Sequence, residues 1–246
     1  MGVLGDTLID IALNKLGIVK EGIPLVTTVD QEELQSLFEG YTKRLHSRLI
    51  TINLDDITDV VYENTTKFVY KTKPYKIAML GNHQVRNASL AIEIIKQLEI
   101  LKLVHVDEVN LVNGLYKTFW PGRLETFGNI VIDGAHNIGG ATALKESIET
   151  LYKDKYIKVL FTSMADKEYF DIIRILETYA DEIHFTEIDY PRCETAENLY
   201  NVSEFKNKHL NKNSSDALKT LRNLKKNEIL LITGSLYFIS HIRKEI

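Results

Sequence analysis

The sequence holds a single cysteine, Cys193, among 246 residues. One cysteine cannot form an internal disulfide, and this scarcity is typical of proteins from reducing compartments. No stretch approaches the roughly 20 consecutive apolar residues that a membrane helix needs, and the first residues lack the basic and then apolar pattern of a secretory signal. Together these absences predict a cytoplasmic protein that has no membrane partner.

Common catalytic signatures are missing as well. No glycine is followed by lysine, so the chain has no GxxxxGK[ST] phosphate loop, and no GxGxxG follows a predicted strand. The CxxC, HExxH and GxSxG patterns are also absent, which excludes the commonest zinc and acyl-hydrolase signatures. Without a GxGxxG pattern, the hypothesis of a dinucleotide-dependent oxidoreductase has little support.

The chain also lacks a large excess of either basic or acidic residues. The chain has 30 Lys and Arg residues against 34 Asp and Glu residues, a net charge of −4, so it shows no basic footprint of a general nucleic-acid binder. An anionic ligand must therefore be held by a local site. With 44% hydrophobic and 26% charged residues the composition is that of a globular protein, and the length suits two modest domains.

The C-terminal half alternates strands and helices. Predicted strands cover 130–133, 156–162, 182–188 and 228–233, and predicted helices cover 142–152, 169–180, 215–224 and 236–246. This alternation is typical of an α/β fold with a mostly parallel, doubly wound, Rossmann-like sheet. A Pro-Gly pair at Pro121 ends the preceding helical periodicity, so we predict two domains, 1–119 and 120–246.

The N-terminal half predicts a strand, helix, strand unit at 25–28, 31–44 and 49–53, then short antiparallel strands at 59–75 and another strand at 75–80. Further helices are predicted after Gly81 and at 106–116. A first helix at 6–16 places Leu8, Ile11 and Ala12 on one stripe and stops at Gly17.

Lys15 continues that apolar stripe. A lysine at such a position can extend its ammonium group to water. Alternatively, a desolvated lysine loses its proton easily and can react with carbon dioxide to form a carbamate, whose oxygens suit Mg²⁺. The sequence leaves both interpretations open.

The stretch WPGRLETFGNIVIDGAHNIGG, residues 120–140, concentrates candidate ligand-binding side chains. Asp133, His136 and Asn137 lie on a loop after a predicted strand, where ligands bind in open α/β sheets, and the next helix offers N–H groups to anions. These residue types are equally ordinary in turns and caps. Composition alone therefore leaves a functional loop and a structural loop as alternatives.

Two other places put polar side chains at the start of a predicted helix. The crossing that ends in Ser235 repeats the strand, glycine, hydroxyl, helix arrangement that suits an anionic group. Gln84 and Asn87 are three residues apart and share one face near the start of the helix after Gly81. Their amides can contact a base or a phosphate, or they can be capping and surface residues.

The blocks GDTLIDIALNKLGIVKEGIP, GNHQVRNASLAIE, WPGRLE, VIDGAHNIGG, ADKEYFD, YPRCETAENL and ITGSLYFI occur in this order. They resemble the bacterial folylpolyglutamate synthases of the Mur ligase superfamily, which are often bifunctional with dihydrofolate synthase, over essentially the whole chain. The resemblance implies a central ATPase domain followed by a Rossmann-like domain, with the active site between them. It also implies a monomeric ligase that uses ATP and Mg²⁺ to phosphorylate a carboxylate of tetrahydrofolate or a dihydropteroate-type substrate, which the amine of L-glutamate then attacks.

The resemblance also assigns roles to individual positions. Four residues correspond to nucleotide contacts: Gln84, Asn87, Arg123 and Asp133. Lys15 corresponds to the lysine that the family carbamylates to hold a metal. His136 and Ser235 correspond to positions associated with glutamate handling, and we take Lys15 and His136 as the candidate catalytic residues. Phosphoryl transfer depends mostly on positioning and charge neutralisation, which suits this set.

The chain departs from the family pattern in what it lacks. The family places its phosphate loop and further metal ligands in an N-terminal half of the central domain that this sequence does not contain, so we expect a fragment that cannot hydrolyse ATP by itself. Asn14 and Leu16 stand where the family favours Glu and Ala, and Ile138 stands where proline is usual. Two alternatives stay open: another Mur-type ligase acting on a cell-wall precursor, or a non-catalytic binding module.

Overall fold

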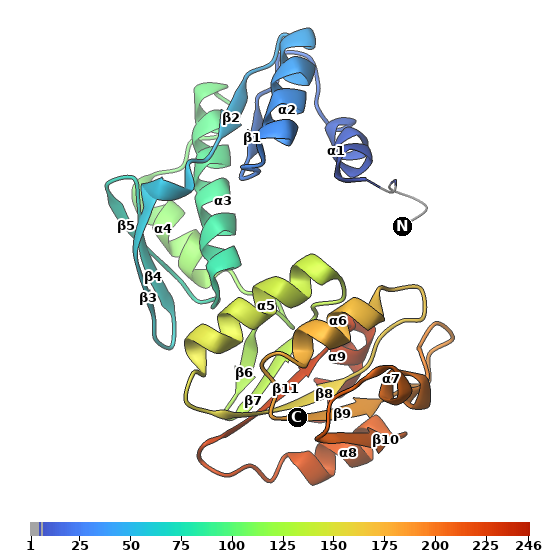
Figure 1. Ribbon diagram of the computed structural model, residues 1–246. Helices are drawn as coiled ribbons and strands as arrows, with labels where there is room; N and C mark the ends of the chain where they lie inside the picture. The colour runs from blue at the N-terminus through green and yellow to red at the C-terminus, as the bar shows by residue number, and fades with distance from the viewer. Residues whose placement is uncertain (1–4, 6) are drawn as a thin grey trace. The chain divides into compact units, whose positions relative to one another are not determined.

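The computed structural model describes residue 5 and residues 7–246, which divide into two compact units (Figure 1). The first unit contains the described residues up to Ile77 together with Gln84–Lys117, and the second contains Ala78–His83 together with Thr118–Ile246. The short segment at 78–83 therefore packs with the C-terminal residues. The functional assignment of 1–119 and 120–246 as two domains stays a prediction.

The first unit combines two small sheets with four helices. Its helices are α1 (Leu8–Leu16), α2 (Glu32–Arg44), α3 (Asn82–Ile100) and α4 (Glu108–Lys117), with a 3-10 turn at Leu54–Asp56. Its strands are β1 (Leu25–Thr27), β2 (Leu49–Thr51), β3 (Ile57–Tyr62), β4 (Thr66–Tyr70) and β5 (Lys73–Ile77). Strands β1 and β2 are parallel, and β3, β4 and β5 are antiparallel. The predicted strand, helix, strand unit and the antiparallel strands are confirmed, but β5 ends at Ile77 because the chain there leaves the sheet for the second unit.

Helix α1 begins at Leu8, and the Asp6 with which the predicted helix began lies outside the described residues. Thr7 caps the helix: its side chain accepts from the N–H of Asp10, and Asp10 accepts from the N–H of Thr7. The buried stripe is Ala12 and Leu16, whereas Leu8 is exposed. The predicted stripe through Leu8 is therefore wrong, because α1 packs on α2 through its C-terminal half.

The second unit is one six-stranded sheet with helices on both faces (Figure 1). Its strands are β6 (Glu125–Phe127), β7 (Ile130–Asp133), β8 (Tyr156–Phe161), β9 (Glu182–Thr186), β10 (Lys208–Asn211) and β11 (Glu228–Thr233), in the spatial order β10-β9-β8-β11-β7-β6. Its further helices are α5 (Ile138–Leu151), α6 (Tyr169–Leu176), α7 (Ala196–Val202), α8 (Ser214–Leu221) and α9 (Leu236–Ile242). All neighbouring strands are parallel except β6, which runs antiparallel to β7. The predicted mostly parallel α/β fold is confirmed.

Two apolar cores lie on opposite faces of this sheet. Helices α5, α6 and α7 cover the face that contains Val131, Val159 and Leu231, and helices α8 and α9 cover the face that contains Leu160 and Leu230. Successive strand residues alternate between the two cores, so central strands are buried on both sides. The layers are therefore helix, sheet, helix.

Three elements of the second unit were not predicted from the sequence. Strands β6 and β10 and helix α7 are short, and β10, with the sequence KHLN, has two exposed residues at the edge of the sheet. This strand gives no alternating apolar signal, because Leu210 is its one apolar residue. The residues after 188 therefore resemble an unstructured polar stretch when only the sequence is considered.

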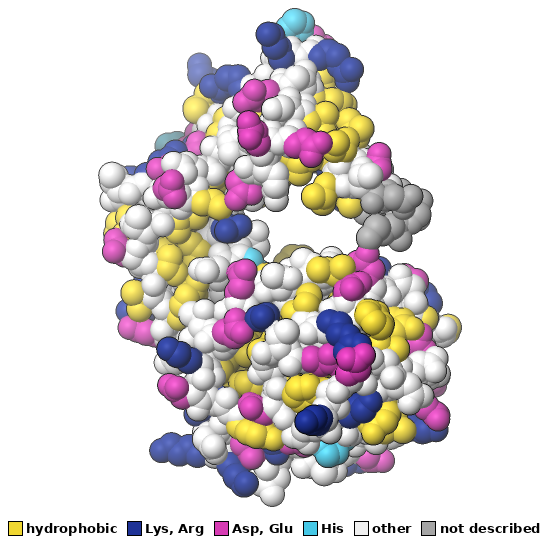
Figure 2. Space-filling view, in the orientation of Figure 1, with side chains coloured by type: hydrophobic (Ala, Val, Ile, Leu, Met, Phe, Trp, Pro, Cys, Tyr) yellow, Lys and Arg dark blue, Asp and Glu magenta, His cyan; other side chains and the backbone are white. Residues whose placement is uncertain are grey.

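Surface charge is mixed. Figure 2 shows Lys and Arg side chains interspersed with Asp and Glu over the face in view, which agrees with the near balance of basic and acidic residues. Among the described residues, no helix is both long enough and apolar enough to cross a membrane.

Candidate active site

The carboxyl ends of β7, β8 and β11 form the switch point of the large sheet. The chain leaves β7 and β8 for α5 and α6 on one face, and it leaves β11 for α9 on the other. Ligand crevices in open α/β sheets lie at such points. A pocket of about 220 Å³ opens here, lined by His136, Met164, Lys167, Arg192, Ser235, Leu236 and Tyr237.

Two of the predicted residues, His136 and Ser235, come together in this pocket from loops about one hundred residues apart. The Nδ1 atom of His136 lies 2.8 Å from the carbonyl oxygen of Gly134. Because a carbonyl can only accept, Nδ1 is the donor in this contact, and the tautomer with the proton on Nδ1 has Nε2 as an acceptor. Ser235 is buried and caps α9, its Oγ accepting from the N–H of Tyr237 at 3.2 Å. Ser235 therefore shapes the end of the pocket, while His136 offers it a basic nitrogen.

The positive charge of the pocket comes from two residues that were not among the predicted site residues. Arg192 Nη2 donates to Asp166 Oδ2 at 2.7 Å, and Lys167 Nζ lies 3.6 Å from the same oxygen. Two cations thus share one carboxylate, which leaves the group net positive. Both sit in sequence blocks quoted for the family resemblance, but only the fold shows that ADKEYFD and YPRCETAENL face His136.

Asp133 ends β7 and is 4% exposed. Its Oδ2 accepts from the N–H of Leu124 at 2.9 Å, and its Oδ1 accepts from the N–H of Ala135 at 2.8 Å. Burial raises the pKa of Asp133, although both N–H donors and the charge of Arg123 act in the opposite direction. Through these two hydrogen bonds, the Asp133 side chain connects the end of the Trp-Pro-Gly-Arg turn to the loop after β7. Its contact with a nucleotide stays a prediction.

The same turn is held from a second side by Glu125, which was not a predicted site residue. Glu125 accepts from the N–H of Gly122 at 2.9 Å and from Arg243 through Nε and Nη2 at 2.8 to 3.1 Å. Gly122 has a φ of +70°, and a Cβ there would lie 2.7 Å from Ile239. Only glycine fits that position without strain. No local signal marks Glu125, because its partner Arg243 is 118 residues away.

The charge of Arg123 acts on both Asp133 and His83, and all three residues belong to the second unit. Burial lowers the pKa of His83, and the charge of Arg123 lowers it further. The Nδ1 atom of His83 is buried without a hydrogen-bond partner among the described residues. His83 belongs to the GNHQVRN block, so this histidine is a candidate that the motif could have indicated but that was not predicted.

The remaining predicted residues lie in the first unit. Gln84 is buried and Asn87 is exposed, and Asn87 Nδ2 donates to Gln84 Oε1 at 3.2 Å, which confirms that they share one face of α3. Lys15 is exposed in the last turn of α1. The burial on which its carbamylation hypothesis depends is therefore not found among the described residues. That these three residues share a site with Arg123 and Asp133 stays a prediction, because Arg123 and Asp133 belong to the other unit.

A larger hollow of about 600 Å³ lies at the carboxyl ends of β9 and β10. Its acidic lining residues are Glu187, Asp189 and Glu194, and its basic ones are Lys212 and His241. Since the acidic side chains are the more numerous, an anionic substrate would meet repulsion there. The smaller, cationic pocket is therefore the better candidate for binding a carboxylate.

Comparisons with known proteins place this geometry in context. Residues 122–236 match the family model described as Mur ligase, glutamate ligase domain. The dihydrofolate synthase/folylpolyglutamate synthase of Bacillus subtilis is 37% identical to this chain over its whole length, which corresponds to 60% of that protein. The chain therefore spans less than two thirds of this relative.

Solved structures show the same fold. E. coli FolC in complex with DHPP and ADP has a TM-score of 0.82 at 18% identity, covering 98% of this chain and 57% of that chain. The bifunctional folylpolyglutamate synthase/dihydrofolate synthase of Yersinia pestis, complexed with AMPPNP and Mn ion, has a TM-score of 0.80 at 17% identity, covering 99% and 58%. Both of these structures hold an adenine nucleotide, and the second also holds a divalent metal.

Proposed function

We propose that this chain, which contains a Mur ligase glutamate ligase domain and is related to the folylpolyglutamate synthases, is part of an ATP-dependent ligase that adds L-glutamate to tetrahydrofolate. The family resemblance of the sequence blocks is confirmed by the Bacillus subtilis relative. Because that relative is also named a dihydrofolate synthase, the proposal includes a dihydropteroate-type acceptor. The activity is assigned to a longer protein, since the chain spans 60% of this relative.

One observation carries the glutamate assignment: a net positive pocket at the switch point of the sheet, with His136 beside Lys167 and Arg192. Glutamate has two carboxylates and an amine that must lose a proton before it attacks. Arg192 and Lys167 supply donors for carboxylates, and the planar fork of arginine suits them best. The Nε2 atom of His136 supplies an acceptor for the ammonium group.

The proposed reaction has two steps. A carboxylate oxygen of the folate substrate bonds to the γ-phosphorus of ATP as ADP leaves, which gives an acyl phosphate. The glutamate nitrogen then attacks the acyl carbon, the amine loses a proton, and inorganic phosphate leaves. His136 would hold the amine and accept its hydrogen bond, while Arg192 and Lys167 would orient the carboxylates.

For the nucleotide, the proposal assigns Arg123, Asn87, Gln84 and Asp133 to contacts, and Asp133 also shapes the turn that presents Arg123. Arg123 fits this role, because Asp133 holds the backbone at the neighbouring Leu124 and feels the charge of Arg123. Bound Mg²⁺ would neutralise phosphate oxygens. Unmodified Lys15 offers it no oxygen, so a metal role for Lys15 requires the carbamate.

Calorimetric titration of the 246-residue chain with L-glutamate tests the pocket. We expect weak binding that falls at least about tenfold in Arg192→Gln, because a charge-assisted hydrogen bond contributes about 1.5 to 3 kcal/mol. Arg222→Gln is the matched control, since Arg222 is exposed at the end of α8 and outside the pocket. Equal binding by the two variants would exclude this pocket as the glutamate site.

A coupled ATPase assay with folate and glutamate tests the need for a longer protein. We expect no folate-dependent turnover from the 246-residue chain, and such turnover would contradict the proposal. Titration with other amino acids separates the folate branch from a cell-wall ligase, which would prefer a different amino acid. A module without catalytic ancestry would bind none of ATP, folate and glutamate.

A further inference from the structure

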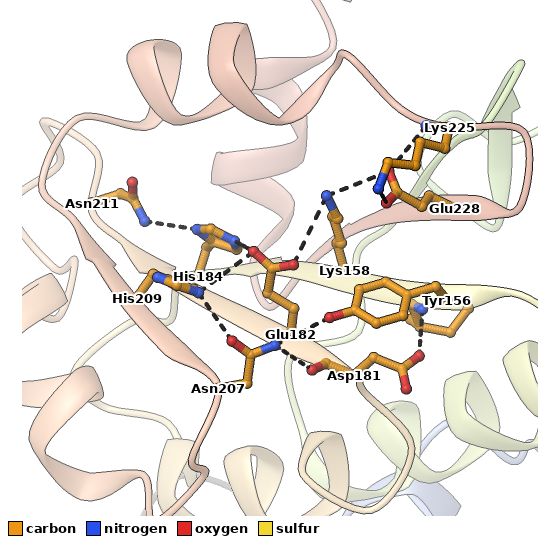
Figure 3. Close-up of polar contacts among 11 residues, drawn as sticks. Tyr156, Lys158, Asp181, Glu182, His184, Asn207, His209, Asn211, Lys225 and Glu228 are labelled. Carbon is orange, nitrogen blue, oxygen red and sulfur yellow. Dashed lines mark hydrogen bonds and ion pairs between the residues drawn. The ribbon is translucent and has the colours of Figure 1, made fainter.

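A second cluster of chemically active side chains lies on β9 and β10, away from the pocket. Glu182 and His184 are two residues apart on β9, so their side chains share one face of the sheet. His209 on β10 is the parallel partner of His184, and the two imidazole rings stack with centroids 4.5 Å apart. Figure 3 shows both rings beside the Glu182 carboxylate.

The distances bring three donor atoms to one point. His184 Nε2 lies 2.7 Å from Glu182 Oε1, and His209 Nε2 lies 3.5 Å from the same oxygen. One ligand atom from each residue falls within 4.8 Å of the others. Zinc bonds of about 2.0 to 2.2 Å in a tetrahedral site place neighbouring ligand atoms about 3.3 to 3.6 Å apart. The His209–Glu182 distance already lies in this range, and the shorter His184–Glu182 contact must lengthen by about 0.6 to 0.9 Å.

The donor set selects the class of cation. Two imidazole nitrogens and one carboxylate oxygen suit Zn²⁺, Co²⁺, Ni²⁺ or Cu²⁺, whereas Mg²⁺ and Ca²⁺ prefer oxygen alone. The His184 side chain is 9% exposed and that of Glu182 is 17% exposed, but that of His209 is 47% exposed. The cluster therefore has a fixed inner side and an open outer side where water can complete the coordination.

Neighbouring amides contact both rings with the polarity of a hydrogen-bonded network, so each contact must change before Nε2 of either ring binds a metal. Asn211 Nδ2 lies 3.0 Å from His184 Nδ1, and Asn207 Oδ1 lies 3.3 Å from His209 Nε2. Coordination through Nε2 of His184 requires a proton on Nδ1, and the Asn211 amide can accept it after exchanging its oxygen and nitrogen positions.

The surrounding charges do not exclude a cation. Lys158 Nζ lies 3.9 Å from Glu182 Oε2, but it lies closer, at 3.4 Å, to Glu228 Oε2. Two carboxylates thus surround the partly buried ammonium of Lys158, and the Lys225 side chain that approaches Glu228 is 82% exposed. The Oε1 atom of Glu182, which faces the histidines, is free of lysine contacts among the described residues.

We propose that Glu182, His184 and His209 bind one divalent cation of the zinc class, at a site that shares no residue with the glutamate pocket. The site joins β9 to the edge strand β10, so the cation would cross-link two strands and stabilise the edge of the sheet. The competing explanation is a self-contained hydrogen-bonded network of the same three side chains.

Equilibrium dialysis of the chelator-treated 246-residue chain against Zn²⁺ tests the proposal. We expect one equivalent bound, with affinity at least about tenfold lower in His209→Ala and in Glu182→Gln. His209 is the first choice, because its exposed ring can be removed without opening the core. The matched control is His105→Ala, whose side chain is 94% exposed in the first unit. Circular dichroism of each variant checks that it is folded.

Co²⁺ gives a second readout, because the intensity of its visible absorption reports the coordination geometry. We expect a four- or five-coordinate spectrum in the parent chain that disappears in His209→Ala and persists in Cys193→Ser. Absence of Zn²⁺ binding, unchanged affinity in folded His209→Ala, or loss of the spectrum in Cys193→Ser would each overturn the proposal.

Discussion

The two units differ in how completely they bury their sheets. The second unit has one six-stranded sheet with an apolar core on each face. The first unit divides its strands between a two-stranded parallel sheet and a three-stranded antiparallel sheet, and its two cores are smaller. Strand β1 contributes to both cores, through Leu25 to one and Val26 to the other. The second unit therefore has the features of an independently stable domain, whereas the first divides its burial between two small cores.

The exposed apolar side chains follow the same division. In the first unit, Leu8 is 66% exposed and Ile18 is 75% exposed. The β1–β2 pair also leaves its outer edges without a strand partner among the described residues. A two-stranded sheet is marginal by itself, so the difference teaches that burial, rather than helix or strand propensity, separates a stable unit from a weak one.

The largest effect is expected from Gly234→Val in the second unit. Gly234 has a φ of +113°, and a Cβ there would lie 1.9 Å from the carbonyl oxygen of Thr162. Because that neighbour is backbone, we expect a loss of about 4 kcal/mol or more in the free energy of unfolding, measured by urea denaturation.

The control for this change is Gly40→Ala on α2, where an added Cβ meets nothing within 4 Å. We expect that variant to gain about 0.5 to 1 kcal/mol, because alanine favours a helix over glycine. An unchanged urea midpoint for Gly234→Val would show that the close approach of Gly234 to Thr162 is wrong.

A matched pair of core truncations compares the two units directly. Leu230→Ala, in a fully buried position of the second unit, should cost about 3 to 5 kcal/mol. Leu34→Ala, 8% exposed in the small core beneath α2, should cost about 2 kcal/mol, because the surrounding residues can collapse more easily. Hydrogen exchange followed by mass spectrometry assigns each loss of stability to its unit. Equal losses in the two variants would contradict the proposed difference in burial between the units.

A pair of glutamates tests the electrostatic contrast. Glu125 accepts from Arg243 and from the N–H of Gly122, whereas Glu93 in the first unit meets Lys71 at 3.2 Å and Lys96 at 3.6 Å. Burial raises the pKa of Glu125, but these donors outweigh it and hold the pKa below its usual range. Glu125→Gln should therefore lose about 1 to 3 kcal/mol at pH 7, and Glu93→Gln less.

The contribution of Glu125 to the free energy of unfolding should depend on pH. A carboxyl with a lowered folded pKa stabilises the protein above its unfolded pKa of about 4.3, and that stability is lost as the pH falls through the folded value. The difference between wild type and Glu125→Gln should thus shrink on acidification from about pH 6 to about pH 3. A difference that grows instead would contradict the contribution of the Arg243 pair.

The smallest effect is expected from Leu13→Ser, on the partly exposed side of α1 that borders a hollow with α2. Leu13 is 45% exposed, so the free energy of unfolding should change by no more than about 0.5 kcal/mol. Thermal denaturation measures it. A loss above about 1.5 kcal/mol would mean that this side of α1 is covered, and the contrast between the units would weaken.

Much of the second unit could be predicted because its signals are local. Strands β7 and β11 appear at the predicted residues, since each is a continuous apolar run between polar ends. Helix α1 was less predictable: its apolar spacing allowed Leu8 or Leu16 on the buried side, and only packing against α2 made the choice. Strand β10 gave no signal, because an edge strand is not required to be apolar.

The sequence by itself determined the alternation of the longer strands and helices, the α/β class and the loop that carries Asp133 and His136, because periodicity, turns and caps act between residues close in the chain. Only the tertiary structure decided which distant side chains meet. Lys167 and Arg192 join His136, Glu125 meets Arg243, and His184 stacks on His209. Each of these contacts depends on strand order and parallel register, which are determined by the burial of the whole sheet.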